Sequence, residues 1–254
     1  MIAAALLALS LAAEPCGPPP VAPGPRPWAT GETATYDLAL FGLVKAGSID
    51  LTVEHPMPGG KVIPLRARAR TDASVRNMLA LTAVSFSWVE ARTLLPERYR
   101  EEADEDGVHK VSDARLSPPG PTIEMAYDIG GQRSTGRFPR QGTVLDAVSA
   151  VYALRAARLA PGDRLCFDLL GRGRVWRVTG TVASKLEKLD TVVGKLETLR
   201  IDATASLADR PGEPVRQMHV WFSTDARRLF VAAVGDIDLG PIQVKLTELR
   251  GARR

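Results

Sequence analysis

Apolar and polar residues alternate with a period of two over several stretches of this chain, and this pattern constrains its fold more than any other feature. Ile49, Leu51 and Val53 alternate with polar residues, as in a strand with one buried and one solvated face. The same alternation recurs in residues 199–205, 218–222 and 242–246. Turn-forming sequences separate the alternating segments: Pro58-Gly59-Gly60, Gly130-Gly131, Pro211-Gly212 and Gly240-Pro241. The sequence therefore predicts about 10–12 antiparallel strands.

One segment of the chain predicts a long helix instead. Residues 143–159 are rich in Ala, Leu and Arg and carry an apolar stripe at helical spacing. Thr143 is suited to cap the start of this helix, and Pro161-Gly162 to end it. A shorter stretch, residues 74–81, also predicts one or two helical turns. The expected fold class is mainly β, with a large antiparallel curved sheet, barrel or half-barrel and one long α-helix packed on or in it.

The composition is that of a globular protein, with 45% hydrophobic and 24% charged residues. We predict a single β-rich domain over residues 30–250, preceded by a Pro-rich arm over residues 14–29 and followed by a C-terminal tail over residues 251–254. The net charge of +4 is spread along the chain, so no binding of nucleic acid is expected.

The first residues carry an export signal. Residues 1–13, MIAAALLALSLAA, form an apolar run of the length of a signal-peptide core, although no Lys or Arg follows Met1. The run is too short for a membrane-spanning helix, so the mature chain is expected to lack a transmembrane segment. These features predict an exported protein of the periplasm or outer envelope.

The two cysteines, Cys16 and Cys166, are candidates for one disulfide, which an oxidising compartment would allow. Two unpaired thiols are the alternative, with Cys166 buried between Leu165 and Phe167. Lipidation of Cys16 is disfavoured because Pro15 precedes it, where a lipoprotein has a small residue.

The residues contain no recognisable catalytic motif, phosphate-binding loop or zinc-protease helix. The three histidines have no metal-ligand spacing, so neither a metal nor a cofactor is expected. His219 shares a predicted strand face with Gln217 and Trp221, a surface that fits either ligand contact or a structural role. The acidic run 101–106 is interpreted as a solvated hairpin tip. Arg66, Arg68 and Arg70 are assigned to an outer strand face paired with acidic residues or, less favoured, to an anion-binding strip.

Several segments together resemble a family of exported bacterial proteins, domain of unknown function 3108. They are residues 31–37 (GETATYD), 94–99 (LLPERY), 146–155 (DAVSAVYALR), 159–163 (LAPGD) and 221–229 (WFSTDARRL). The resemblance implies an envelope protein built on one large antiparallel sheet. It implies no activity and no catalytic residues, because the family has none assigned. Within 221–229, Asp225 suits a hairpin turn.

We therefore expect a non-enzymatic envelope protein whose curved sheet binds a hydrophobic ligand, such as a lipid or acyl chain. The candidate apolar lining is Val84, Phe86, Trp88, Tyr152, Met218 and Phe222, with ordinary core packing as the alternative role of each. A second hypothesis is an assembly module with a solid core that contacts other envelope proteins. An enzyme of unknown type is a third.

Overall fold

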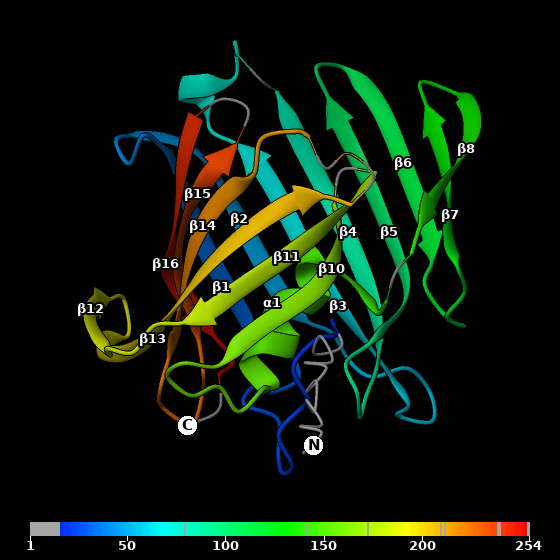
Figure 1. Ribbon diagram of the computed structural model, residues 1–254. Helices are drawn as coiled ribbons and strands as arrows, with labels where there is room; N and C mark the ends of the chain where they lie inside the picture. Colours follow the sequence, from blue (N-terminus) through cyan, green and yellow to red (C-terminus); the bar gives the residue numbers. More distant parts are fainter. Residues whose placement is uncertain are drawn as a thin grey trace, which may run out of the picture.

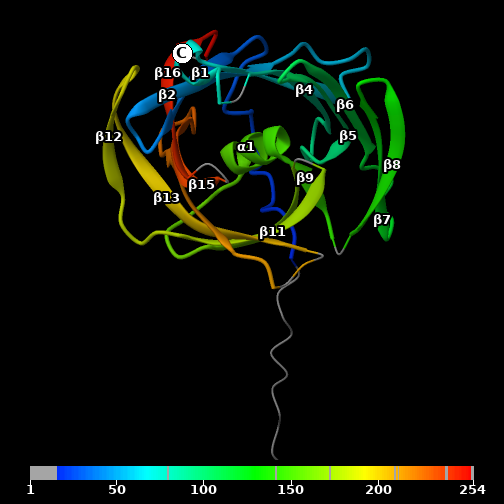
Figure 2. The same cartoon turned by 90° about the horizontal axis from the view of Figure 1, so that it is seen from above.

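In the computed structural model, a single sheet curls around a central helix. The structure describes residues 16–252, except 79, 141, 172, 209, 211, 238 and 239. The predicted signal peptide, residues 1–13, and the last two residues of the predicted tail lie outside the described residues. Seen from above, the strands form a ring around α1 (Figure 2). The mainly β class and the curved sheet with one helix are confirmed.

The elements follow one another along the chain with these bounds: β1 Thr33–Leu40, β2 Val44–Val53, β3 Val62–Thr71, η1 Ala73–Val75, β4 Leu81–Glu90, β5 Pro96–Glu105, β6 Val108–Arg115, β7 Thr122–Ile129, β8 Gln132–Pro139, β9 Val144–Asp146, α1 Ala147–Ala156, β10 Arg164–Gly171, β11 Arg174–Val182, β12 Glu187–Thr191, β13 Gly194–Leu207, β14 Arg216–Ser223, β15 Phe230–Ile237 and β16 Gly240–Arg250.

The sheet has 16 strands in the order β8-β7-β6-β5-β4-β3-β2-β1-β16-β15-β14-β13-β11-β10-β9, with β12 paired to β13 (Figure 1). Neighbouring strands are antiparallel except β9 and β10, which are parallel. The path ends at β8 and β9, so the barrel is not closed by hydrogen bonds. Buried side chains fill the seam between β5–β7 and β9–β11, among them Ile123, Met125, Val144 and Leu170.

The strand number exceeds the predicted 10–12 because some strands lack an apolar face. β8 (QRSTGRFP) and β12 (EKLDT) consist largely of polar, exposed or half-buried residues. Both pair with only one neighbour, at the margins of the sheet. A strand that buries neither face shows no hydrophobic period, so its sequence resembles a loop.

The long helix is shorter than predicted. Residues 144–146 form β9 against β10, and α1 begins only at Ala147. The N-cap is Asp146 rather than Thr143, and its carboxylate accepts hydrogen bonds from the backbone N–H groups of Val148 and Ser149. The Ser149 hydroxyl in turn accepts a hydrogen bond from the backbone N–H of Asp146, which completes a capping box. The apolar stripe continued through β9 because this strand is buried on both faces.

The second predicted helix, residues 74–81, is a single 3₁₀ turn over Ala73–Val75. Leu81 already belongs to β4, where it pairs with Glu105. A single helical turn forms few backbone hydrogen bonds, so it stabilises the helical conformation only weakly. The C-terminal residue of the segment, Leu81, is instead held in β4 by pairing with the neighbouring strand.

The N-terminal arm is bound to the body of the barrel. Cys16 and Cys166 form a disulfide, which confirms the predicted bridge over the alternative of two free thiols. Gly17 and Val21 make isolated β-bridges to Cys166 and Ala157. The arm therefore crosses from β10 to the C-terminal end of α1.

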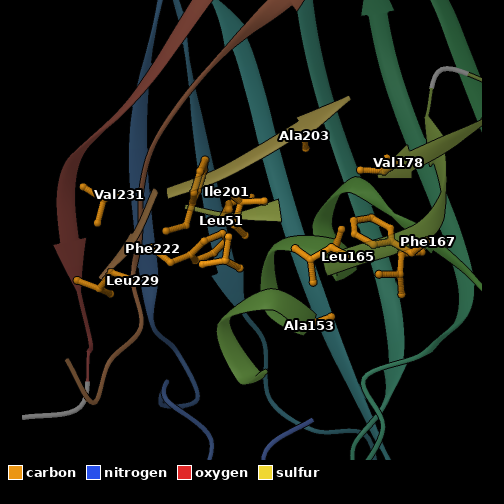
Figure 3. Packing of buried hydrophobic residues seen from close by; sticks show 14 of the residues in the cluster. Leu51, Ala153, Leu165, Phe167, Val178, Ile201, Ala203, Phe222, Leu229 and Val231 are labelled. Carbon is orange, nitrogen blue, oxygen red and sulfur yellow. The ribbon is translucent and has the colours of Figure 1, made fainter. Parts of the chain in front are cut away.

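Helix α1 is packed on both sides, which makes one end of the barrel solid. On one side it contacts a large cluster of strand residues that includes Leu165, Phe167, Val178, Ile201 and Phe222 (Figure 3). On the other side Val148 and Tyr152 pack with Trp28, Leu65 and Leu94.

Candidate functional site

The two ends of the barrel differ. The β2–β3 and β4–β5 hairpins and the N-terminal arm lie at the end that α1 fills, which we call the helix end. The β1–β2, β3–β4, β5–β6 and β7–β8 hairpins lie at the opposite end, which we call the open end (Figure 1). A cavity of about 610 Å³ lies inside the open end. This volume falls within the range of about 300–1,000 Å³ found for small-molecule sites.

Most of the cavity wall is apolar. Its apolar side chains come from β1–β5, β7, β10 and β16 and from the segment around η1: Leu38, Leu40, Ala46, Ala69, Val75, Met78, Leu81, Ala83, Ala103, Met125, Ile129, Leu170 and Ile242. Ala69 pairs with Ala83, and Ala83 pairs with Ala103, so three alanines form a row across β3, β4 and β5. Their methyl groups extend only a short way into the interior, and at this end of the barrel no α-helix of the described residues packs in front of them. These alanines are part of the cavity wall.

One wall of the cavity is polar. Glu101 and Glu105 of β5 and Lys110 of β6 face the interior. The Lys110 ammonium donates to the Glu105 carboxylate over 2.6 Å, and the Tyr99 hydroxyl donates to Glu101 over 2.9 Å. Burial, followed by the charge of Glu101, raises the pKa of Tyr99, so its hydroxyl stays protonated and remains a donor at neutral pH. Glu101 thus has a neutral hydrogen-bond partner, whereas Glu105 is paired with the Lys110 ammonium.

A buried polar network near the cavity has a structural role. Asp146 is fully buried and accepts hydrogen bonds from the hydroxyls of Ser87 and Ser149, besides its cap bonds. Burial raises the pKa of the Asp146 carboxyl, and the hydrogen bonds from Ser87 and Ser149 oppose that shift. With its acceptor sites occupied, this carboxylate fixes the start of α1 against β4.

Three of the predicted lining residues lie outside the barrel. Val84, Phe86 and Trp88 alternate with Ala83 and Ser85 along β4, and Ala83 faces the cavity. Phe86 stacks on Trp88 with ring centroids 5.6 Å apart. The Arg98 guanidinium lies 5.2 Å from the centre of the Trp88 ring. The expectation that they line the interior is therefore corrected, because they share the outer face of β4, where the Arg98 guanidinium lies over the Trp88 ring.

The other three predicted lining residues lie inside the barrel, and two of them, Tyr152 and Phe222, lie at the helix end. Tyr152 is buried in the cluster with Trp28, at a ring distance of 5.0 Å. Phe222 belongs to the large cluster around α1, and the half-buried Met218 packs against this cluster. None of these three lines the cavity of the open end; the two aromatic rings pack the core of the helix end.

The polar wall was missed because the acidic run 101–106 was interpreted as a hairpin tip. The run instead continues β5 as far as Glu105, and only Asp106 and Gly107 form the turn. Alternation within the strand sends Glu101 and Glu105 inward and their neighbours outward. The available signal was the apolar residue Ala103 in the middle of the run.

The remaining candidates from the sequence are structural. His219 lies 2.5 Å from Asp202 on the neighbouring strand, at Nδ1 and Oδ1. Arg66 pairs with Glu54 over 2.5 Å, as expected for an outer sheet face. Within residues 16–252, less the gaps given above, no group of three potential metal ligands is found. No helix in this part of the chain is long and apolar enough to cross a membrane.

Three of the segments that carry the family resemblance, residues 31–37, 146–155 and 221–229, meet at one buried arginine. Arg155 of α1 donates to the Glu32 carboxylate over 2.6 Å, and both side chains are almost completely buried. Its other nitrogens donate to the backbone carbonyls of Arg227 and Arg228, 3.1 Å away in each case. The Arg155 guanidinium also lies over the rings of Trp28 and Tyr152. These segments therefore hold the helix in the barrel and do not form the cavity.

Comparison with solved structures supports the fold. A β-barrel-like protein of the domain of unknown function DUF1849 from Brucella abortus is 13% identical, with a TM-score of 0.57 over 88% of this chain and 98% of that one. A candidate exported protein with a YmcC-like fold from Bacteroides fragilis is 7% identical, with a TM-score of 0.35 over 91% and 99% of the two chains. A candidate lipoprotein from Parabacteroides distasonis is 9% identical, with a TM-score of 0.35 over 89% and 97%. Only the first is near enough to bear on the architecture.

No curated protein matches the chain. The family described as "Protein of unknown function (DUF3108)" matches residues 35–247, which is most of the sequence and agrees with the resemblance seen in its segments. The chain therefore belongs to the DUF3108 family.

Proposed function

We propose that this protein binds a hydrophobic ligand with an acyl chain in the cavity of the open end. The observation that carries the proposal is the cavity of about 610 Å³, whose largely apolar wall includes the alanine row Ala69, Ala83 and Ala103. Empty apolar volume costs stability, and a bound apolar molecule recovers the lost contacts.

The polar wall favours one class of ligand head. Glu101 faces the cavity with a neutral hydrogen-bond partner, the Tyr99 hydroxyl, whereas Lys110 is paired with Glu105. A free carboxylate next to this wall meets like charge, whereas a neutral head with hydroxyl or amide donors finds carboxylate acceptors. We therefore propose an acyl ligand with a neutral, hydrogen-bond-donating head, such as a monoacylglycerol.

Export is part of the proposal. The apolar run 1–13 has the length of a signal-peptide core, and the Cys16–Cys166 bond requires an oxidising compartment. A periplasmic or outer-envelope location supplies both the oxidant and access to lipids. The binding of other envelope proteins would be the rival function if the cavity proves to take no ligand.

The first test fills the cavity. Ala83→Trp places a large side chain in the middle of the alanine row, and Thr82→Trp places the same side chain on the exposed outer face of β4. The loss of room for two methylenes, at about 0.8 kcal/mol each, weakens binding by about tenfold. We expect A83W to lower the affinity for a fluorescent monoacylglycerol by at least that factor, and T82W to leave it unchanged, in a direct titration. Equal affinities of A83W and the wild type would refute the proposal.

A second prediction concerns the head. Monopalmitoylglycerol should compete with the fluorescent probe better than palmitate does, because only palmitate brings a carboxylate to Glu101. Glu101→Gln removes the like charge, so it should narrow the difference in binding affinity between monopalmitoylglycerol and palmitate. Competition titrations at neutral pH measure both. Stronger competition by palmitate with the wild type would contradict the proposed head class.

A further inference from the structure

Exposed apolar side chains gather around the open end. Most of the large apolar side chains that are exposed in the described part of the chain lie in the turns and strand ends of the open end: Phe41, Leu43, Val44, Met78, Val108, Ile129 and Val215. The others, Met57, Leu186 and Val192, lie at the helix end. The seven residues of the open end come from five connections of the sheet, so they form a rim around the mouth of the cavity and not one local patch. We call these seven residues the apolar rim.

The β1–β2 hairpin displays its apolar residues at a conformational cost. Phe41 and Gly42 both have positive φ, 53° and 67°, in the two-residue turn between Leu40 and Leu43. Such turns favour Asn, Asp or Gly, and a bulky residue is strained there. The neighbouring hairpins of the open end use Asp106-Gly107 and Gly130-Gly131 at the same positions. Here a phenylalanine is used, and it is 60% exposed, while Leu43 is 88% exposed.

The charges near this hairpin balance one another. Lys45 pairs with Asp37 over 3.0 Å, and Arg76 lies near Asp72. The β5–β6 hairpin adds an excess of acid through Asp104, Glu105 and Asp106, of which Glu105 is paired with Lys110. The β1–β2, β3–β4 and β5–β6 hairpins thus carry no net positive charge to attract anionic lipid, so a neutral, zwitterionic headgroup layer is the lipid surface that they fit.

We infer that the open end docks on a zwitterionic lipid surface, with Phe41, Leu43 and Met78 entering the boundary between headgroups and acyl chains. Met78 links the rim to the cavity, because it lines the cavity and is also 70% exposed. A docked barrel would exchange an apolar ligand with the bilayer without exposing it to water. The choice of lipid over a protein partner rests on the proposed function, whereas the exposed rim does not.

The test measures co-sedimentation of the full chain with phosphatidylcholine vesicles. We expect Leu43→Glu to weaken partitioning by about tenfold or more, since a buried leucine contributes about 1.5–3 kcal/mol of transfer free energy. Val192→Glu is the matched control, because Val192 is also exposed in a hairpin but lies at the helix end. It should leave partitioning unchanged. Partitioning should also persist from about 0.1 M to about 1 M salt, because it does not depend on charge.

The inference and the proposed function can fail separately. A83W should lose the soluble probe but still bind vesicles, and L43E should bind the soluble probe but not vesicles. Absence of vesicle binding by the wild type, equal loss in L43E and V192E, or binding only to anionic vesicles at low salt would each overturn the docking inference. Self-association of the wild type through the open end, abolished by L43E without any vesicle binding, would also overturn it. Circular dichroism of each variant verifies that it is folded.

Discussion

Replacement of Arg155 by methionine is expected to lower the free energy of unfolding by about 3–5 kcal/mol, because it leaves the Glu32 carboxylate buried without a counter-charge. Glu32 is 1% exposed, and its second oxygen has no hydrogen-bond partner among the described residues. The substitution also removes the donors to the carbonyls of Arg227 and Arg228. Chemical denaturation of the variant and the wild type measures the difference.

Two controls separate the buried charge from a general effect of losing an arginine. Arg158→Met, three residues further on and exposed, should change the free energy of unfolding by less than about 0.5 kcal/mol. The double variant Arg155→Met with Glu32→Gln should recover a large part of the loss, because no charge is then left unpaired. A single variant as stable as the wild type would show that this ion pair does not hold α1 in the barrel.

The second large effect is expected from removal of the disulfide. Cys16 and Cys166 are 150 residues apart in sequence, so their bond closes a long loop in the unfolded chain. The double variant Cys16→Ala with Cys166→Ala should be less stable by about 2–4 kcal/mol. The arm that the bond holds leads to Trp28, which is buried against Tyr152. The loss of stability should therefore accompany a shift of tryptophan fluorescence toward that of a solvated ring.

Treatment of the wild type with a reductant should reproduce the effect of the double variant. Addition of the reductant to the double variant should change nothing, which makes that variant its own control. Equal melting temperatures of the oxidised wild type and the variant would mean that the arm is held by its other contacts, such as the hydrogen bond from Ala22 to Ala156.

Much of the fold could be predicted because burial of one sheet face imposes a period of two on the sequence. The stretch around Ile49, Leu51 and Val53 shows this, since all three side chains of this part of β2 face the interior of the barrel. The period fails where no face is buried, as in β8 and β12. The period also fails in β9, but for the opposite reason: both faces of this strand are buried. Val144 and Leu145 are therefore both apolar, and they continue the apolar pattern of the helix.

The site could not be predicted to the same extent, because a cavity depends on register between strands. Ala69, Ala83 and Ala103 are separate alanines in the sequence and become a row only when β3, β4 and β5 pair. The larger apolar residues of β4, Phe86 and Trp88, favour an assignment to the inner face of the sheet. In the structure the inner face of β4 carries Ala83 and small serines instead. Alternation identifies two faces of a strand without specifying which one is inside.

The central claim, that the open end holds an apolar ligand, is tested most directly by native mass spectrometry of the full chain after incubation with monopalmitoylglycerol. The account predicts one added ligand mass on the wild type and on Thr82→Trp, and a much smaller bound fraction on Ala83→Trp. A wild-type protein that stays bare under these conditions, or an Ala83→Trp variant with the same bound fraction, would contradict it.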